Sequence, residues 1–189
     1  MEHHLFWITS RAAGTAALLL ASAAVCVGLV MGGRLLRSRG PDLRALHEAL
    51  SLATIAALVV HGVSLLGDGF LHPSVADVSV PFASGYREPW MAAGIVGGWM
   101  LILLGLSCYA RGRIGPARWR TLHRFTALAW ILGVVHTLAE GTDARQTWFL
   151  VAAVALAIPA ATLLAVRHST GPPARPRAGV RRAAPAPTE

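Results

Sequence analysis

Long apolar stretches separated by short polar ones dominate residues 12–166 of the chain. Each stretch holds close to the roughly 20 apolar residues that an α-helix needs to cross a bilayer core of about 30 Å. The pattern therefore predicts an all-α integral membrane protein, a bundle of five transmembrane helices surrounded by lipid. The expected spans are residues 12–33, 46–66, 90–110, 121–139 and 147–166.

The arginines predict the orientation of this bundle, because cytoplasmic connections of membrane proteins collect basic residues. All 17 basic residues are arginines, and 14 of them lie after span one, between spans three and four, at the start of span four, or after span five. We therefore expect the N-terminus outside and the C-terminus in the cytoplasm of a cell whose inner membrane holds the protein. Topology and anionic lipid headgroups account for the formal charge of +8, so no nucleic-acid partner is predicted.

The sequence divides into one membrane domain and a tail. Residues 1–168 form the expected transmembrane domain, and no glycine-rich phosphate loop or internal repeat interrupts it. Residues 169–189 are rich in Pro, Arg and Ala. Because such a segment cannot bury an apolar core, we expect it to be a disordered cytoplasmic tail.

Four histidines fall inside two of the spans, and an ionisable residue within a membrane is costly enough to suggest a function. His47 and His61 lie in span two, and His123 and His136 lie in span four. The two spans run in the same direction because one span separates them. The first histidine of each span should therefore lie at the cytoplasmic level and the second at the outer level. Separations of 14 and 13 residues correspond to roughly 20 Å along a helix.

Two imidazoles at each level suit the iron of a b-type haem. Two neutral histidine ligands make the iron six-coordinate, which favours electron transfer over binding of a further ligand. Two such haems could relay electrons from one face of the membrane to the other. One zinc or copper ion cannot span both levels, and neither level offers a second pair of ligands.

The spacing in the fourth span poses a geometric problem. On an ideal helix His136 points about 140° away from His123, whereas the two histidines of span two differ by only about 40°. Span four should therefore contain a kink or a π-bulge, or the haems should be gripped from different faces.

The paired histidines, the TLHR run entering span four and the SRAAG run opening span one resemble the ferric reductase-like transmembrane domain. This family includes ferric reductases, NADPH oxidases and the haem-binding membrane subunit of bacterial methionine sulfoxide reductase systems. The resemblance covers about residues 7–166. It implies that His47 and His123 hold an inner haem b. It likewise implies that His61 and His136 hold an outer one.

The resemblance also suggests roles for four arginines. Arg11 matches a position beside the outer haem of the oxidases, with an ordinary interfacial arginine as the alternative. Arg44, Arg120 and Arg124 could pair with propionates of the inner haem, because guanidinium matches carboxylate geometry. The alternative for these three is the general excess of arginine on the cytoplasmic side.

Two departures from the family pattern matter. The fused flavin and nicotinamide domain of the reductases and oxidases is not found in this sequence, so we expect electrons from a separate flavoprotein or from quinol. Leu65 stands where the oxidases place a further histidine, one turn after the outer ligand, which argues against superoxide production.

Two classes of function remain open. In the first, the chain is an electron-transfer subunit of an oxidoreductase that reduces ferric iron outside or feeds a partner protein. In the second, it is a non-redox carrier or assembly subunit whose histidines relay protons or bind a transported cation. The outer loop over residues 67–89 could dock an external acceptor, or it could be an irregular solvated loop.

Overall fold

The structure is a computed structural model that describes residues 2–32, 40–70 and 72–169, and within these ranges all regular structure is helical. The five predicted spans and the multi-pass membrane class are confirmed, since five helices are long and apolar enough to cross a bilayer. Several spans extend beyond the predicted bounds because the helices continue into polar residues of the interface. The observed spans are His4–Gly32, Pro41–Leu65, Glu88–Ile114, Pro116–Glu140 and Thr147–Val166.

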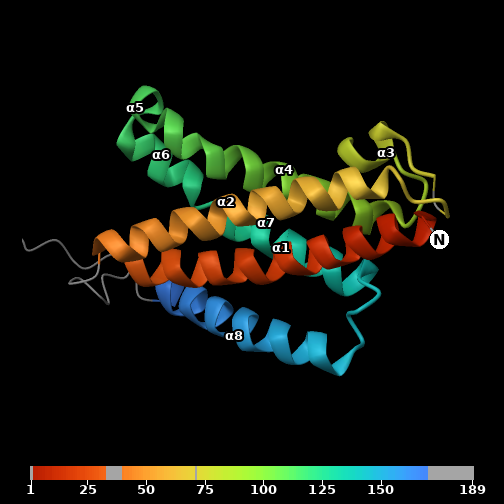
Figure 1. The fold of residues 1–189 in the computed structure, drawn as a ribbon. Helices are drawn as coiled ribbons and strands as arrows, with labels where there is room; N and C mark the ends of the chain where they lie inside the picture. The colour runs from red at the N-terminus through yellow and green to blue at the C-terminus, as the bar shows by residue number, and fades with distance from the viewer. Residues whose placement is uncertain (1, 33–39, 71, 170–189) are drawn as a thin grey trace, which may run out of the picture.

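The bundle is built from two helix pairs and a fifth helix. Helix α1 (Glu2–Gly32) packs along α2 (Gly40–Leu65), and α4 (Glu88–Leu106) packs along α7 (Thr126–Glu140). Helix α8 (Thr147–Ser169) packs on α1, on the side away from α2 (Figure 1). Helices α2 and α7 do not pack closely against each other, and the two pairs join through contacts of α1 with α7 and of α2 with α4.

A short helical corner links the third and fourth spans. Helix α4 continues into the 3₁₀ turn η2 (Ser107–Ala110) and then into α5 (Arg111–Ile114). Gly115 follows with φ of 89°, a backbone conformation that favours glycine, and α6 (Pro116–His123) begins directly after it. This corner lies at the end of the bundle opposite the N-terminus and α3 (Val75–Ser79) (Figure 1).

The fourth span contains the break that the histidine spacing requires. Helix α6 ends at His123 and α7 begins at Thr126. The intervening N–H groups of Arg124 and Phe125 donate to carbonyl oxygens three residues earlier, at 3.3 and 3.0 Å. Such a tightened turn has about 3.0 residues per turn instead of 3.6, so it changes the direction in which the next helix faces. Of the expected alternatives, the structure has the kink.

The connection between the second and third spans is more ordered than a loop. Ser74 caps α3 in a reciprocal arrangement with Asp77, whose carboxylate accepts hydrogen bonds from Ser74 that lower the pKa of Asp77. The indole Nε1 of Trp99 donates to the Ser79 carbonyl at 2.8 Å and ties this connection to α4. The expectation of an irregular solvated loop over residues 67–89 is corrected in part, because these residues include the short helix α3.

Small side chains fill the contacts between the helices. Ala21 and Ala160 are buried together with Trp130, and the Trp130 indole donates to the Ser22 hydroxyl at 3.0 Å. Small residues let membrane helices approach closely. This close packing stabilises the bundle, because lipid tails are as apolar as the helices and provide no hydrophobic driving force for their association. Of the tail expected over residues 169–189, only Ser169, which ends α8, is among the described residues.

Candidate functional site

The four intramembrane histidines form two facing pairs. The ring centroids of His47 and His123 are 6.1 Å apart, and those of His61 and His136 are 6.5 Å apart. In each pair one ring comes from α2 and the other from the fourth span, either the end of α6 or the middle of α7. The structure thus brings together the residues that the sequence places at each level, at depths about 20 Å apart along α2.

The separation within each pair suits a single metal ion between two imidazoles. A metal–nitrogen bond of about 2 Å on each side, plus the distance from each nitrogen to its ring centre, places two centroids about 6 Å apart. Among the described residues no three His, Cys, Asp or Glu side chains gather as a metal site. Two imidazole nitrogens without further ligands are a donor set that would suit haem iron better than tetrahedral zinc.

Three of the four rings are held by a backbone carbonyl of a neighbouring helix. In each case Nδ1 donates to a carbonyl oxygen at 2.8 to 2.9 Å. This bond fixes the ring tautomer and orientation, and it leaves Nε2 without a proton and available to a metal. The donors and acceptors are His47 with Ala24, His61 with Ser10, and His136 with Trp90.

A glycine stands four residues after each of these carbonyls. Because residues four apart lie one above the other on a helix, a side chain there would meet the histidine ring. A Cβ atom at Gly94 would come within 2.5 Å of Nδ1 of His136, and one at Gly14 within 2.9 Å of Nδ1 of His61. At Gly28 a Cβ atom would lie 3.1 Å from a carbon of the third ring. Glycine therefore allows the rings to reach the carbonyls.

His123 is held in a different way. Its Nδ1 is buried and has no hydrogen-bond partner within the described part of the chain. The ring instead stacks on Trp119, with centroids 4.9 Å apart and planes inclined by 22°. The Trp119 indole donates to the Ser107 hydroxyl at 3.1 Å, and that hydroxyl donates to the Leu104 carbonyl at 2.6 Å. His47 with His123 is called the inner pair and His61 with His136 the outer pair, after the levels expected from the sequence. The inner pair thus has one ring held by a carbonyl and one held by stacking.

A family model described as "Ferric reductase like transmembrane component" matches residues 13–134, well over half of the chain. The chain belongs to the ferric reductase-like transmembrane family. Membership indicates transmembrane electron transfer. The match includes three of the four paired histidines and ends two residues before His136. No curated protein and no solved structure matches the chain.

Arg11 lies beside the outer pair of this ferric reductase-like chain. It directly follows Ser10, whose carbonyl holds His61. Its guanidinium makes a bidentate ion pair with Asp143 in the connection between α7 and α8. The Arg11 side chain is 36% exposed and that of Asp143 only 6%, and the guanidinium also lies 5.0 Å from the centre of the Trp7 ring. The ion pair fixes the outer end of α1 against the last two helices.

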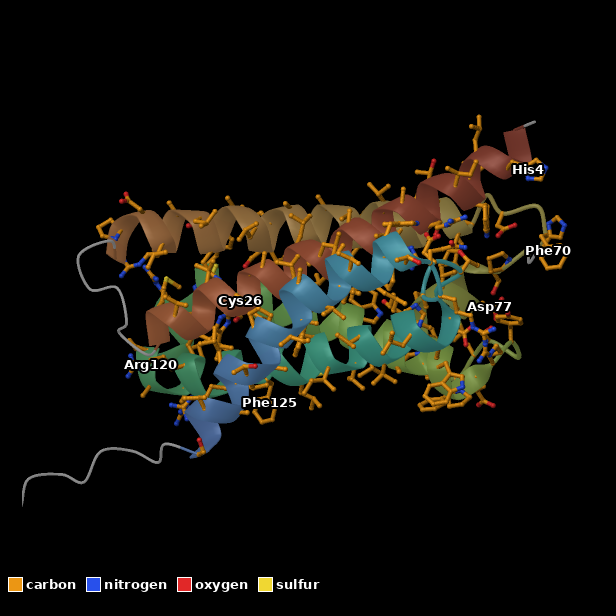
Figure 2. All side chains as sticks on the ribbon, turned by 90° about the horizontal axis from the view of Figure 1, so that it is seen from below. His4, Cys26, Phe70, Asp77, Arg120 and Phe125 are labelled. Carbon is orange, nitrogen blue, oxygen red and sulfur yellow. The ribbon has the colours of Figure 1, made fainter. Side chains whose placement is uncertain are left out.

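The other three candidate arginines lie at the opposite end of the bundle. Arg44, Arg120 and Arg124 are exposed, and none has an ion-pair partner among the residues that the structure describes. Figure 2 shows Arg120 at the end away from His4 and Asp77. Their guanidinium groups are therefore free to meet an anionic group at the level of the inner pair.

Sequence reasoning missed the residues that hold the rings. The carbonyls of Ser10, Ala24 and Trp90 carry no side-chain signal. A signal did exist in the glycines, since Gly14 and Gly28 are separated by 14 residues, the same separation as His47 and His61. Trp119 carries no such signal, because a tryptophan near the end of a span is typical of the membrane interface, and its stacking on His123 depends on the corner before α6.

The outer connection forms a half-open hollow of about 200 Å³ next to the outer pair. Leu65, one turn after His61, lines it together with Met91, which follows Trp90. Asp77 and Tyr86 add polar groups to an otherwise mostly apolar wall. Leu65 therefore lies in the wall of this hollow.

Proposed function

We propose that this chain carries electrons across the membrane through two b-type haems, an inner one held by His47 and His123 and an outer one held by His61 and His136. The observation that carries the proposal is the pair of ring separations, 6.1 and 6.5 Å, which fit one iron atom between each two rings. When bound, each haem supplies a one-electron couple at its level.

The residues around the rings support electron transfer rather than binding of a substrate to iron. Carbonyl acceptors at Nδ1 fix the orientation of three rings and leave Nε2 on the side away from the carbonyl. His47 with His123, and His61 with His136, would each hold one haem through two imidazoles, a ligand set that would supply electron transfer rather than binding of an exogenous ligand. The spacing of about 20 Å along α2 supports one site near each side of the bilayer.

The arginines fit the two ends of such a relay. Arg44, Arg120 and Arg124 are exposed near the inner pair, where guanidinium groups can bind the carboxylates of haem propionates. Arg11 acts at the outer haem by keeping Ser10 and its carbonyl in place, since its own guanidinium is engaged by Asp143. The roles of these four arginines are part of the proposed function, as the two haems are.

We further propose that electrons enter at the arginine-rich inner end and leave at the outer end. The donor is a separate flavoprotein or a quinol, and the acceptor is an external one that docks over the hollow beside Leu65 and Met91. The arginine distribution supports a cytoplasmic inner end in the inner membrane of the cell, so a cytoplasmic donor would meet the inner end first.

The decisive experiment is a haem count on the purified full chain. We expect a dithionite-reduced b-type spectrum and two haems per chain, and no haem in the double variant His47→Ala, His61→Ala. His72→Ala, which removes an exposed histidine of the outer connection, serves as the control and should keep both haems. A colourless wild-type preparation from haem-replete cells would contradict the proposal.

The donor can be identified with the same preparation. Reduction of the haems by menaquinol in the absence of any soluble protein indicates a quinol donor. Reduction only after a flavoprotein and a reduced nicotinamide are added indicates a protein donor. If the protein is colourless and the histidine variants instead abolish a proton or metal flux, the non-redox carrier is the correct function.

A further inference from the structure

An ion pair fastens the start of α4 to the end of α7. Nε of Arg87 lies 3.0 Å from a carboxylate oxygen of Glu140. The Arg87 side chain is 49% exposed, whereas that of Glu140 is only 9% exposed. The contact is not aligned as a hydrogen bond, and the same oxygen has no hydrogen-bond partner elsewhere in the described part of the chain. A buried carboxylate with a single cationic partner depends strongly on that partner.

This ion pair follows the same register as the contact that holds His136. Arg87 precedes Trp90 by three residues, and Glu140 follows His136 by four. Helices α4 and α7 belong to consecutive spans and run in opposite directions, so a step back along α4 matches a step forward along α7. The ion pair therefore lies about one helical turn beyond the bond between His136 and the Trp90 carbonyl.

A third contact, nearer the middle of α4, agrees with this register. At Gly97 a Cβ atom would lie 3.0 Å from the Ala129 carbonyl oxygen, so the two backbones approach closely there. From this contact to the ion pair, α4 steps back by 10 residues and α7 steps forward by 11. The two helices thus keep one register from Gly97 to Arg87, and the bond to His136 lies between these two contacts.

The backbone of Arg87 is also fixed by its surroundings. Arg87 has φ of 40°, in the left-handed region that favours glycine. A residue with a side chain persists there only where the structure around it holds it. Its carbonyl accepts hydrogen bonds from the N–H groups of Trp90 and Met91 at 3.0 and 3.3 Å. Arg87 is therefore joined to the turn that carries the Trp90 carbonyl and, through Glu140, to the end of α7.

The other outer ring has an equivalent support. Arg11 directly follows Ser10, whose carbonyl holds His61, and it pairs with Asp143, three residues after Glu140. Helices α1 and α4, which supply the two outer carbonyls, are thus each fastened to one short segment at the end of α7. Within the described residues these are the only two ion pairs, and both lie beside the outer histidines.

We propose that Arg87 and Glu140 position His136, because their ion pair keeps the first turn of α4 in the register at which the Trp90 carbonyl meets Nδ1. The inference rests on the proposed function, since His136 is a proposed ligand of the outer haem. Both are positioning residues that act through the Trp90 carbonyl. They do for His136 what Arg11 does for the other outer ligand.

The consequence concerns the outer haem alone. A hydrogen bond from Nδ1 to a carbonyl makes an imidazole a more basic ligand, and a more basic ligand stabilises ferric over ferrous iron. Loss of the register should weaken this bond and let the ring of His136 turn. The midpoint potential of the outer haem should then rise, and the inner haem, whose ligands lie at the other end of the bundle, should keep its potential.

The test compares two double variants of the full chain with haem bound, and neither variant changes the net charge. Arg87→Gln with Glu140→Gln removes the ion pair. The matched control, Arg145→Gln with Glu88→Gln, removes an exposed arginine and an exposed glutamate that have no ion-pair partner in the described part of the chain. Because the net charge is constant, a shift found only in the first variant comes from the lost ion pair.

We expect the first double variant to shift the low-spin ferric signal of the outer haem in electron paramagnetic resonance, which reports the orientation of the ligand rings. Its outer midpoint potential should rise, by up to about tenfold in the ferric-to-ferrous preference, or about 59 mV for a one-electron couple. The control variant should keep the wild-type signals and potentials of both haems.

An unmoved outer signal with two haems bound overturns this inference and leaves the proposed function standing, as does an equal shift in the control. Loss of the outer haem alone supports the inference. If the first double variant binds no haem, the single variant Glu140→Gln decides through its outer signal, since a shifted signal supports the inference and an unshifted one overturns it. A wild-type chain without haem overturns the proposed function, and this inference with it.

Discussion

The outer and the inner histidine pair differ more in how their rings are held than in how far apart they lie. The separations of 6.5 and 6.1 Å are nearly equal. Each outer ring donates to a backbone carbonyl, and a glycine stands four residues after that carbonyl. In the inner pair only His47 is held in this way. The outer level is also fastened by the ion pair between Arg11 and Asp143, while the described arginines at the inner end are unpaired.

This difference shows that two properties of each pair have different structural origins. Positions of histidines along α2 and the fourth span set the depth and the spacing of the pairs, which is a matter of helix geometry. The orientation and basicity of each ring depend on the helix behind it, through a carbonyl and the absence of a side chain. A site can therefore keep its spacing while one ligand changes its character, as the inner pair does at His123.

Removing one histidine should have the largest effect on haem content, and it should show which pair holds which haem. We expect His136→Ala to lower the haem content from two to about one per chain by emptying the outer site, because iron loses one of only two protein ligands. His123→Ala should empty the inner site in the same way. Haem extraction and low-temperature spectra measure both. Loss of both haems in either variant, or of neither, would contradict two independent sites.

A methyl group at one glycine should act almost as strongly. In Gly94→Ala the new Cβ would lie 2.5 Å from Nδ1 of His136, so the ring must move and lose a hydrogen bond worth about 1 kcal/mol. We expect most of the outer haem to be lost and the inner haem to stay. The matched control is Gly98→Ala, one turn further along α4 with nothing within 4 Å, which should retain two haems. Equal loss in both variants would indicate a general defect of α4.

Much of the fold could be predicted from the sequence, because every helix that crosses the bilayer needs an apolar stretch of similar length. Five apolar stretches predicted five spans, and the angular mismatch of His123 and His136 predicted a break in the fourth. The helix ends were less predictable: α1 begins at Glu2, and Arg111–Ile114 in the corner after the third span are helical. Hydropathy detects only the part of a helix that lies in the hydrocarbon core.

The candidate site was predictable only as far as side chains carry the signal. Histidines in apolar spans are rare enough to stand out. Their order along two parallel helices predicted which histidines face each other. The carbonyls of Ser10, Ala24 and Trp90 could not be predicted, because every residue has one and only the packing of helices selects among them. The partner of Arg11 was missed for the same reason, since Asp143 lies 132 residues away in sequence.

The ion pair at the outer level should contribute to stability by a smaller amount. Arg11→Gln leaves the carboxylate of Asp143 buried without its partner, which costs about 1 to 2 kcal/mol at a pair that is partly open to solvent. Arg145→Gln, which removes an exposed arginine from the same connection, is the control for the change in charge. Thermal unfolding in detergent compares the two. An equal loss of stability in both variants would mean that net charge matters and the ion pair does not.

The smallest effect concerns the ring that stacks on His123. Trp119→Phe keeps an aromatic face against the imidazole but loses the hydrogen bond to Ser107, whereas Trp119→Leu loses both. Aromatic stacking of this kind contributes about 0.5 to 1.5 kcal/mol, too little to empty the inner site. We therefore expect two haems in each variant and a broadened low-spin ferric resonance of the inner haem in Trp119→Leu alone, measured by electron paramagnetic resonance. The outer signal should be the same in all three proteins, because Trp90 and Ser10 hold its ligands without any aromatic stack, and a change there would show that the two levels are not independent.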